Sequence, residues 1–181
     1  FFALDDLPSF AVEPGEARDS LLLRVVGSPD TYGKHTDGMG GATSSTSTVV
    51  IISPSNRIDS DLNYLFGQVA IDRPTIDWSG NCGNLSAAVA GFGISRGMLD
   101  PGKIPRNGFC EVRIWQENIG KVIVAKVPIV NGLVQEDGGF ELDGVAFPAA
   151  EILLDFVDPG DDSAGSVFPS GSVLDKLEVP G

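Results

Sequence analysis

The segment that most limits the fold is residues 84–99, "NLSAAVAGFGISRGML", which is apolar or small on nearly every side until Ser95. A helix without a polar face must be enclosed by other elements of the protein. Its Ala, Gly and Ser residues also allow strands to approach it closely. We therefore expect a helix over Leu85–Gly97 with strands on nearly every side.

The rest of the chain supplies those strands. A continuous β-branched run, Thr48–Ser53, predicts a buried strand, and residues 61–71 alternate in a way that predicts another, ended by Pro74. Three later strands, joined by "IG", "NG" and "DGG" turn signals, are predicted over 109–118, 120–130 and 149–158.

A second helix is predicted over residues 17–27 by a stripe of leucine and valine side chains. Ser20 or Asp19 is expected to cap it, and Gly27 to end it. Together these elements predict an α+β fold, in which a strongly bent, mostly antiparallel and barrel-like sheet wraps around a central apolar helix.

The charge balance excludes two classes of partner. Lys and Arg number 12 against 25 Asp and Glu, giving a formal net charge of -13. Nucleic acids and anionic membranes both require clustered basic residues, so neither is expected as a partner. The opening residues lack the basic segment of a signal peptide, and no apolar run approaches the ~20 residues of a membrane span. With only two cysteines, a disulfide framework is not expected, and we predict a cytoplasmic location.

Cys82 stands in an unusual setting, "DWSGNCGNLSA", just ahead of the apolar helix. The positive end of a helix dipole and its unpaired N–H groups stabilise a thiolate, which makes such a cysteine usable as an acid or base. The alternative is a turn cysteine in a segment that only caps the helix, with Asn84 as N-cap. Asp77 is interpreted as a turn residue.

A glycine- and hydroxyl-rich loop, "DGMGGATSSTST", covers residues 37–48. Its glycines and hydroxyls predict an anion-binding nest for carboxylates, although an ordinary flexible loop is the alternative. It is not a phosphate-binding P-loop, because it lacks a Gly-Lys-Ser/Thr sequence and a following helix. His35, the only histidine, is expected to be a solvated loop residue, and no metal site is predicted.

Three stretches, "GSPDTYGKHTDGMGGATSSTS", "DLNYLFGQVAID" and "IDWSGNCGNLSAAVAGFGISRGMLD", resemble the PrpF family of methylaconitate and methylitaconate Δ-isomerases, aconitate isomerases and oxalomesaconate tautomerases. The resemblance implies a diaminopimelate-epimerase-like fold of two similar domains with the active site between them. It also implies that residues 1–181 are the first domain of a two-domain protein. The family's first strand would lie upstream of these residues, and the second domain would lie downstream. Residues 158–181 would be an exposed acidic loop leading to the interdomain connection.

The resemblance assigns site residues one by one. The cysteine of the family's Asn-Cys-Gly-Asn motif falls on Cys82, and the flanking motif residues fall on Asn81, Gly83 and Asn84. The substrate-binding loop falls on Gly38, Met39, Gly40, Gly41, Ser44, Ser45, Thr46 and Ser47. Thr48 stands where the family has a lysine that faces the substrate, and a hydroxyl cannot replace an ammonium at neutral pH. Either a lysine upstream of the chain or Lys34 takes over that role, or the substrate differs, or the protein is impaired as a catalyst.

The implied function is a cofactor-free proton shift on small unsaturated di- or tricarboxylates, with Cys82 as one acid/base group. The expected partners are a small polycarboxylate substrate and the second domain, and a homodimer stays open. The alternative function, favoured by Thr48, is a non-catalytic carboxylate-binding or accessory protein of the same fold. A purely structural domain leaves "SGNCGN" unexplained.

Overall fold

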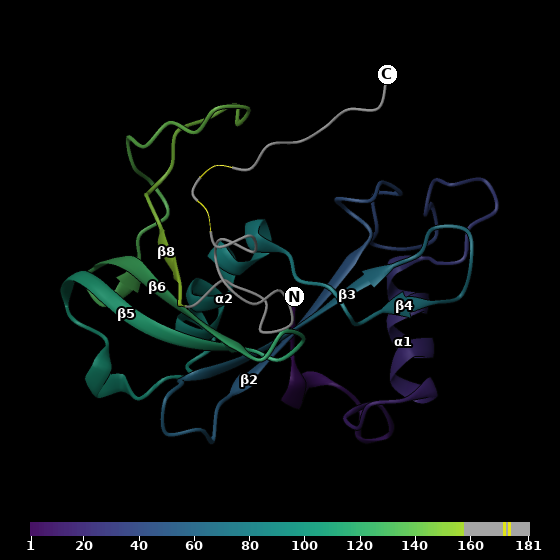
Figure 1. Ribbon diagram of the computed structural model, residues 1–181, viewed down its shortest axis with the longest axis horizontal. Coiled ribbons are helices and arrows are strands. Elements are labelled where there is room, and N and C mark those ends of the chain that lie inside the picture. Colours follow the sequence, from purple (N-terminus) through teal and green to yellow (C-terminus); the bar gives the residue numbers. More distant parts are fainter. Residues whose placement is uncertain (158–171, 173, 175–181) are drawn as a thin grey trace.

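The computed structural model describes residues 1–157 together with Ser172 and Leu174. Within this part of the chain there are two α-helices, α1 (Glu16–Val26) and α2 (Gly83–Ser95). The strands are β1 (Phe2–Ala3), β2 (Thr48–Pro54), β3 (Leu62–Val69), β4 (Ile76–Asp77), β5 (Asn107–Gln116), β6 (Lys121–Val130), β7 (Leu133–Val134) and β8 (Leu153–Phe156). Short 3-10 turns cover Leu4–Asp6, Ser9–Ala11 and Pro101–Lys103. Figure 1 shows this arrangement, and the predicted α+β class is confirmed.

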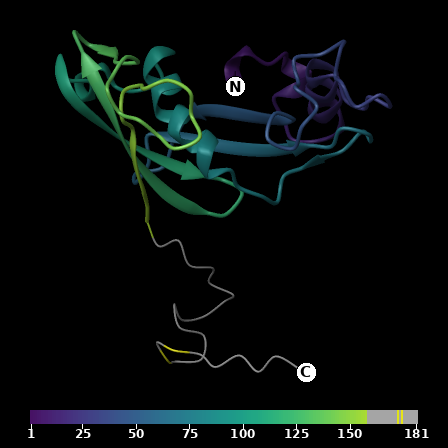
Figure 2. The ribbon, with the colours of Figure 1, turned by 90° about the horizontal axis from the view of Figure 1, so that it is seen from above.

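All of the described strands belong to one curled sheet. Its order is β1-β2-β3-β5-β6-β7, with β4 paired to β3 and β8 paired to β6. The long pairs β2–β3 and β5–β6 are antiparallel, whereas β3 and β5 run parallel over only a few residues. This short parallel junction lies where the sheet bends, so that β5 and β6 curl up beside α2 (Figure 2).

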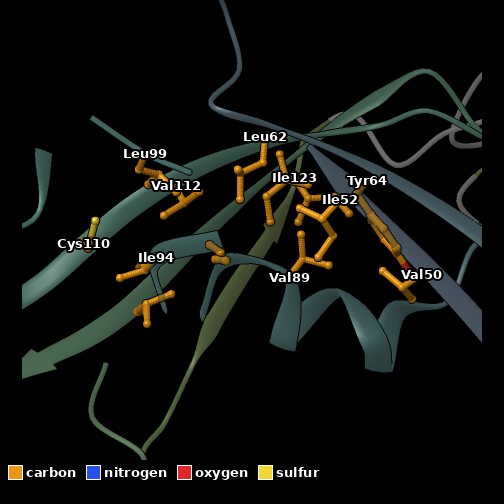
Figure 3. Close-up of a cluster of buried hydrophobic side chains, with 14 of the residues drawn as sticks. Val50, Ile52, Leu62, Tyr64, Val89, Ile94, Leu99, Cys110, Val112 and Ile123 are labelled. Atoms are coloured by element: carbon orange, nitrogen blue, oxygen red, sulfur yellow. The ribbon is translucent and has the colours of Figure 1, made fainter. Parts of the chain in front are cut away.

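Strand β2 is buried on both faces and separates two hydrophobic cores. Val49 and Ile51 pack with α1, and Val50 and Ile52 pack with α2. This follows from the two-residue period of a strand, which sends successive side chains to opposite faces. Figure 3 shows the core on the α2 side, where side chains from the sheet meet Val89 and Ile94 of the helix. The continuous β-branched run therefore encodes a strand covered on both sides.

The predicted enclosure of α2 is wrong along one side of the helix. Val89 and Ala90 are fully buried against the sheet, but Ala88 is exposed and Leu85 and Phe92 are only half-buried. The reason is geometric, because the described strands curl around only part of the helix circumference. One side of this apolar helix is thus only partly covered within the described part of the chain.

Two cap predictions are also wrong. Helix α1 begins after Gly15, so Asp19 and Ser20 lie inside it rather than at its cap. Helix α2 has Cys82, not Asn84, as its N-cap residue, and the Cys82 side chain makes no capping hydrogen bond. The predicted terminator of α1 is confirmed, since Gly27 has a φ of 91°, a left-handed conformation that glycine adopts without strain.

The remaining predictions concern the later part of the chain. The strand expected over 149–158 is shorter, because β8 covers only Leu153–Phe156. The predicted acidic loop over 158–181 lies outside the described residues, apart from Ser172 and Leu174. In the described part, no helix has the length and hydropathy to cross a membrane.

Candidate functional site

Cys82 is held firmly by its backbone at the start of α2. It has extended backbone angles, φ -124° and ψ 104°, and its side chain is half-buried. Its carbonyl oxygen accepts hydrogen bonds from the Ser86 N–H at 3.2 Å, from the Ser86 hydroxyl at 3.0 Å and from the Tyr64 hydroxyl at 3.2 Å. Burial raises the pKa of Tyr64 to about 12, so this hydroxyl remains a donor at neutral pH.

The start of α2 also supplies hydrogen-bond donors. The first intrahelical bond is the one from Ser86 to Cys82, so the N–H groups of Gly83, Asn84 and Leu85 have no partner within the helix. These N–H groups and the helix dipole favour a negative charge beside the Cys82 thiol. Asn81, Gly83 and Asn84 are exposed, as an approaching ligand would require.

The segment leading to Cys82 is tied to its surroundings by three side chains. Asp77 accepts hydrogen bonds from the N–H and hydroxyl of Ser79, which lower the pKa of the Asp77 carboxyl. The prediction of a turn residue is corrected here, because Asp77 is the last residue of strand β4 and only its side chain orders the turn that follows. The Trp78 indole donates to Asp19 of α1 at 3.2 Å, and the Asn118 amide donates to the Trp78 carbonyl at 2.5 Å. Sequence reasoning missed Asn118, which it placed at the end of the strand predicted over 109–118, whereas β5 ends at Gln116.

The glycine loop packs tightly against the end of α1. The N–H groups of Met39 and Gly40 donate to the carbonyls of Val25 and Val26 at 2.8 and 2.9 Å, and thereby cap that helix. A Cβ atom on Gly38 would lie 2.3 Å from the backbone of Val26, so only glycine can occupy this position. These N–H groups are therefore engaged with helix carbonyls, and the loop's remaining polar groups are mainly its hydroxyls.

His35 is not the solvated residue that the sequence predicted. It is 2% exposed, and neither ring nitrogen has a hydrogen-bond partner. Its loop is folded by Asp30, whose carboxylate accepts from the N–H groups of Tyr32, Lys34 and His35, and these bonds lower the pKa of Asp30. The imidazole is thus enclosed by its own loop and the end of α1, a tertiary contact that composition does not reveal.

The hydroxyl side chains that follow the glycines in the sequence form a small cluster. The Thr43 hydroxyl lies 3.0 Å from that of Ser45 and 2.8 Å from that of Thr46, and all three residues are accessible. Ser47 is fully buried and its hydroxyl has no partner. The Gln68 amide donates to the carbonyls of Ser44 and Ser47, each at 2.9 Å, and so attaches this loop to β3.

The sheet register brings the hydroxyl loop and the cysteine segment to one end of β3. Thr48 pairs with Gln68, and Gln68 pairs with Asp77 on its other side. Two interstrand spacings of about 4.8 Å place the Cα atoms of Thr48 and Asp77 roughly 10 Å apart. Strand alternation puts these three side chains on the same face as Val50 and Phe66, which is the face covered by α2.

This shared face is the candidate site. A separate hollow of about 290 Å³ lies at the end of α1, lined by Arg24, Ser28, Asp30, Tyr32, Thr36 and Asp37 among others. It includes neither Cys82 nor Thr48, so we place the site on the α2 side. The structure shows no group of three or more metal-ligating side chains in the described residues.

The family model described as "PrpF protein" matches residues 1–181. The chain is 62% identical to the 2-methyl-aconitate isomerase of Shewanella oneidensis, over 100% of this chain and 46% of that protein. It is 41% identical to the 4-oxalomesaconate tautomerase of Pseudomonas putida, over 98% of this chain and 46% of that protein.

A solved structure is similar as well. The crystal structure of a methylitaconate-delta-isomerase aligns with this chain with a TM-score of 0.85 and 37% sequence identity, covering 97% of this chain and 43% of that one. The chain thus spans about half the length of the curated relatives that it matches.

Proposed function

Since the chain belongs to the PrpF family, we propose that the protein containing it is a cofactor-independent allylic isomerase of small unsaturated di- or tricarboxylates. The relatives named above are an isomerase and a tautomerase of such acids, which supports the same substrate class here. The observation that carries the proposal is Cys82 at the N-cap of α2, on the face shared with Thr48 and the hydroxyl loop.

The reaction is a proton transfer at an allylic carbon. A base removes a proton α or γ to a carboxylate, a dienolate forms, and an acid returns a proton at the other end of the allylic unit. Cys82 is one of these two groups. The N–H groups of Gly83, Asn84 and Leu85 lie where they can stabilise the negative charge of the dienolate.

The hydroxyl loop supplies the substrate contacts in this proposal. Thr43, Ser45 and Thr46 present accessible hydroxyls that can donate to carboxylate oxygens, and Gly38–Gly41 set the path of the loop. Thr48, at the start of β2, occupies the place of a cation. The substrate is then bound through neutral donors, with Lys34 or a lysine outside this chain as the source of a positive charge.

The second domain is part of the same proposal. The relatives are about twice as long as this chain, and one side of α2 is only partly covered, with Ala88 exposed and Leu85 and Phe92 half-buried. A second domain lying over this side would bury it and close the site from solvent. Water exclusion would then strengthen the electrostatic interactions of the dienolate.

A second candidate function rests on Thr48. Without the lysine, the fold could bind polycarboxylates and not isomerise them. Solvent deuterium exchange followed by NMR tests both, with 2-methylaconitate, aconitate and methylitaconate incubated in D2O with the full-length protein. Isomerase activity predicts deuterium at the allylic carbons and its loss in Cys82→Ala. Binding without exchange would favour the second candidate. If the protein shows no binding and no exchange with any of these acids, both candidate functions are refuted.

A further inference from the structure

One edge of β3 is completed by a side chain where a strand would normally lie. Residues Leu62–Tyr64 pair with β5, and Gln68 and Val69 pair with β4 on the same edge. Between these two pairings lies Phe66, whose N–H and carbonyl face the side-chain amide of Asn118. The Oδ1 atom accepts from the Phe66 N–H at 2.8 Å, and Nδ2 donates to the Phe66 carbonyl at 2.7 Å.

Asn118 therefore substitutes for a strand residue in the gap between β5 and β4. Its amide makes two more hydrogen bonds, accepting from the Gln116 amide at 2.6 Å and donating to the Trp78 carbonyl at 2.5 Å. The bond to Trp78 matters most for the site, because β4 ends at Asp77 and no strand pairing holds the chain from Trp78 to Cys82.

Gln68 does the equivalent for the other half of the site. The hydroxyl loop precedes β2, so sheet pairing begins only at Thr48. Apart from the hydrogen bond from Val69 N–H to Ser47, the loop is attached to β3 by the two bonds from the Gln68 amide to Ser44 and Ser47. Both halves of the candidate site are thus fixed to β3 by an amide side chain.

We propose that Asn118 and Gln68 are positioning residues that set where the Cys82 segment and the hydroxyl loop lie relative to each other. Asn118 acts through Trp78 on the cysteine, and Gln68 acts through Ser44 and Ser47 on substrate binding. The catalytic part of this inference rests on the proposed isomerase function. Its structural part, the local ordering of two separate segments, does not.

The test uses two near-isosteric variants of the full-length protein, Asn118→Asp and Gln68→Glu. Each exchanges an N–H donor for a negatively charged oxygen that faces backbone carbonyls, so each releases one segment. Asn131→Asp, in the turn after β6, and Gln135→Glu, near β7, make the same chemical changes away from the site and serve as matched controls.

Hydrogen exchange gives the readout that is independent of activity. In Asn118→Asp we expect faster exchange over residues 78–82 and faster iodoacetamide labelling of Cys82, by about threefold or more, as the segment opens locally. Cys110 should stay protected, because it is 1% exposed inside β5 and global unfolding alone would uncover it. In Gln68→Glu the faster exchange should be confined to residues 43–47, with Cys82 labelling unchanged.

Kinetics then separate the two roles. Asn118→Asp should lower kcat by about tenfold to a hundredfold with little change in KM, because small misplacement of a reacting group is costly. Gln68→Glu should mainly raise KM. If Asn118→Asp does not fold, Asn118→Ser, which retains one donor, replaces it.

Three outcomes decide the inference. Localised exchange with the kcat and KM split supports it. Uniform changes in exchange, or variants that behave like Asn131→Asp and Gln135→Glu, overturn it. If the unsubstituted protein isomerises none of the acids, the proposed function fails, whereas the exchange and labelling results still decide whether the two amides order their segments.

Discussion

Helices α1 and α2 pack on the same sheet but differ in which residues they expose to solvent. Helix α1 buries Leu22, Leu23 and Val26 together with the Arg18 side chain, which donates to the Ala11 carbonyl, and it exposes the charged residues Glu16 and Arg24. Helix α2 carries no charged residue, and the sheet buries only part of its surface. A helix that needs only a core can keep a polar side, as α1 does. Because the neighbouring strands cover an apolar side of α2 only in part, we expect this helix to have a role beyond packing in the core of these strands.

The C-terminus of α1 and the N-terminus of α2 also differ in how their backbone groups are capped. The C-terminal carbonyls of α1 are capped by Met39 and Gly40, so that end is closed by the protein's own backbone. The N-terminus of α2 has no side-chain cap, and Cys82 stands there half-buried. We therefore expect the α1 side to be structural, and the α2 side is where we propose that the chemistry takes place.

The largest effect is expected at the N-terminus of α2. Cys82→Ala should lower isomerisation by about 10²–10⁴-fold, the usual range for loss of a general acid or base. Cys110→Ala is the matched control, since burial raises the pKa of the Cys110 thiol and keeps it out of the chemistry. NMR-monitored deuterium exchange in the full-length protein measures both, and equal activity in the two variants would contradict the assignment of chemistry to α2.

The next effect concerns the α2 face of the sheet at Thr48. Thr48→Lys restores a cation beside the hydroxyl loop, and a charge-assisted hydrogen bond should raise turnover or affinity roughly tenfold to a hundredfold. Cys82→Ala in the same background should abolish the gain. Steady-state rates with aconitate-like acids provide the measurement, and no change in either binding or turnover would show that Thr48 does not lie against the substrate.

A pair of glycines within α2 sharpens the contrast between its buried and less covered sides. A Cβ atom on Gly93 would lie 2.4 Å from the Leu62 side chain, whereas on Gly91 the nearest atom is 3.8 Å away, on Val134. Gly93→Ala should therefore cost about 1–3 kcal/mol of unfolding free energy through overpacking. Gly91→Ala should gain about 0.5–1 kcal/mol from helix propensity. Urea denaturation measures both, and equal shifts would mean that the two sides are packed alike.

The smallest expected effect is a pH dependence of the folding stability that Tyr64 contributes beside α2. Burial raises the pKa of Tyr64 to about 12 from its ordinary value of 10.0, so the folded state holds this proton more tightly than the unfolded chain. The stability contributed by Tyr64 is thus complete below about pH 10 and is lost as the pH rises toward about 12. The difference between the urea midpoints at pH 8 and pH 11 should be smaller in Tyr64→Phe than in the unsubstituted protein. In Tyr32→Phe, whose substituted residue is 85% exposed, this difference should be unchanged.

Local patterns were sufficient for much of the fold. Thr48–Ser53 predicted β2 because a β-branched run has few other uses, and Gly27 predicted the end of α1 because its conformation is local. His35 was mispredicted because its burial depends on packing between a loop and the end of α1. Likewise the sequence shows that α2 is apolar, but it cannot show how much of the cover comes from these strands.

The candidate site divides along the same line. Cys82 was singled out from its neighbours alone, and the structure places it at the start of α2. Asn118 and Gln68 could not be found in this way, because their roles come from hydrogen bonds to segments 40 and more than 20 residues away in the sequence. The signal that could have revealed Asn118 is an amide two residues after a strand, where the chain turns.

Strand β2 has a consequence for how this protein can change. Because its alternate residues belong to different cores, a single inserted or deleted residue within 48–54 would transfer every side chain on one side of the change to the wrong core. Substitutions that preserve size remain open to the strand, but changes of length do not. Because β2 contributes side chains to both hydrophobic cores, neither core is complete without this strand. We therefore expect one cooperative unfolding transition, with no intermediate in which only one core is folded.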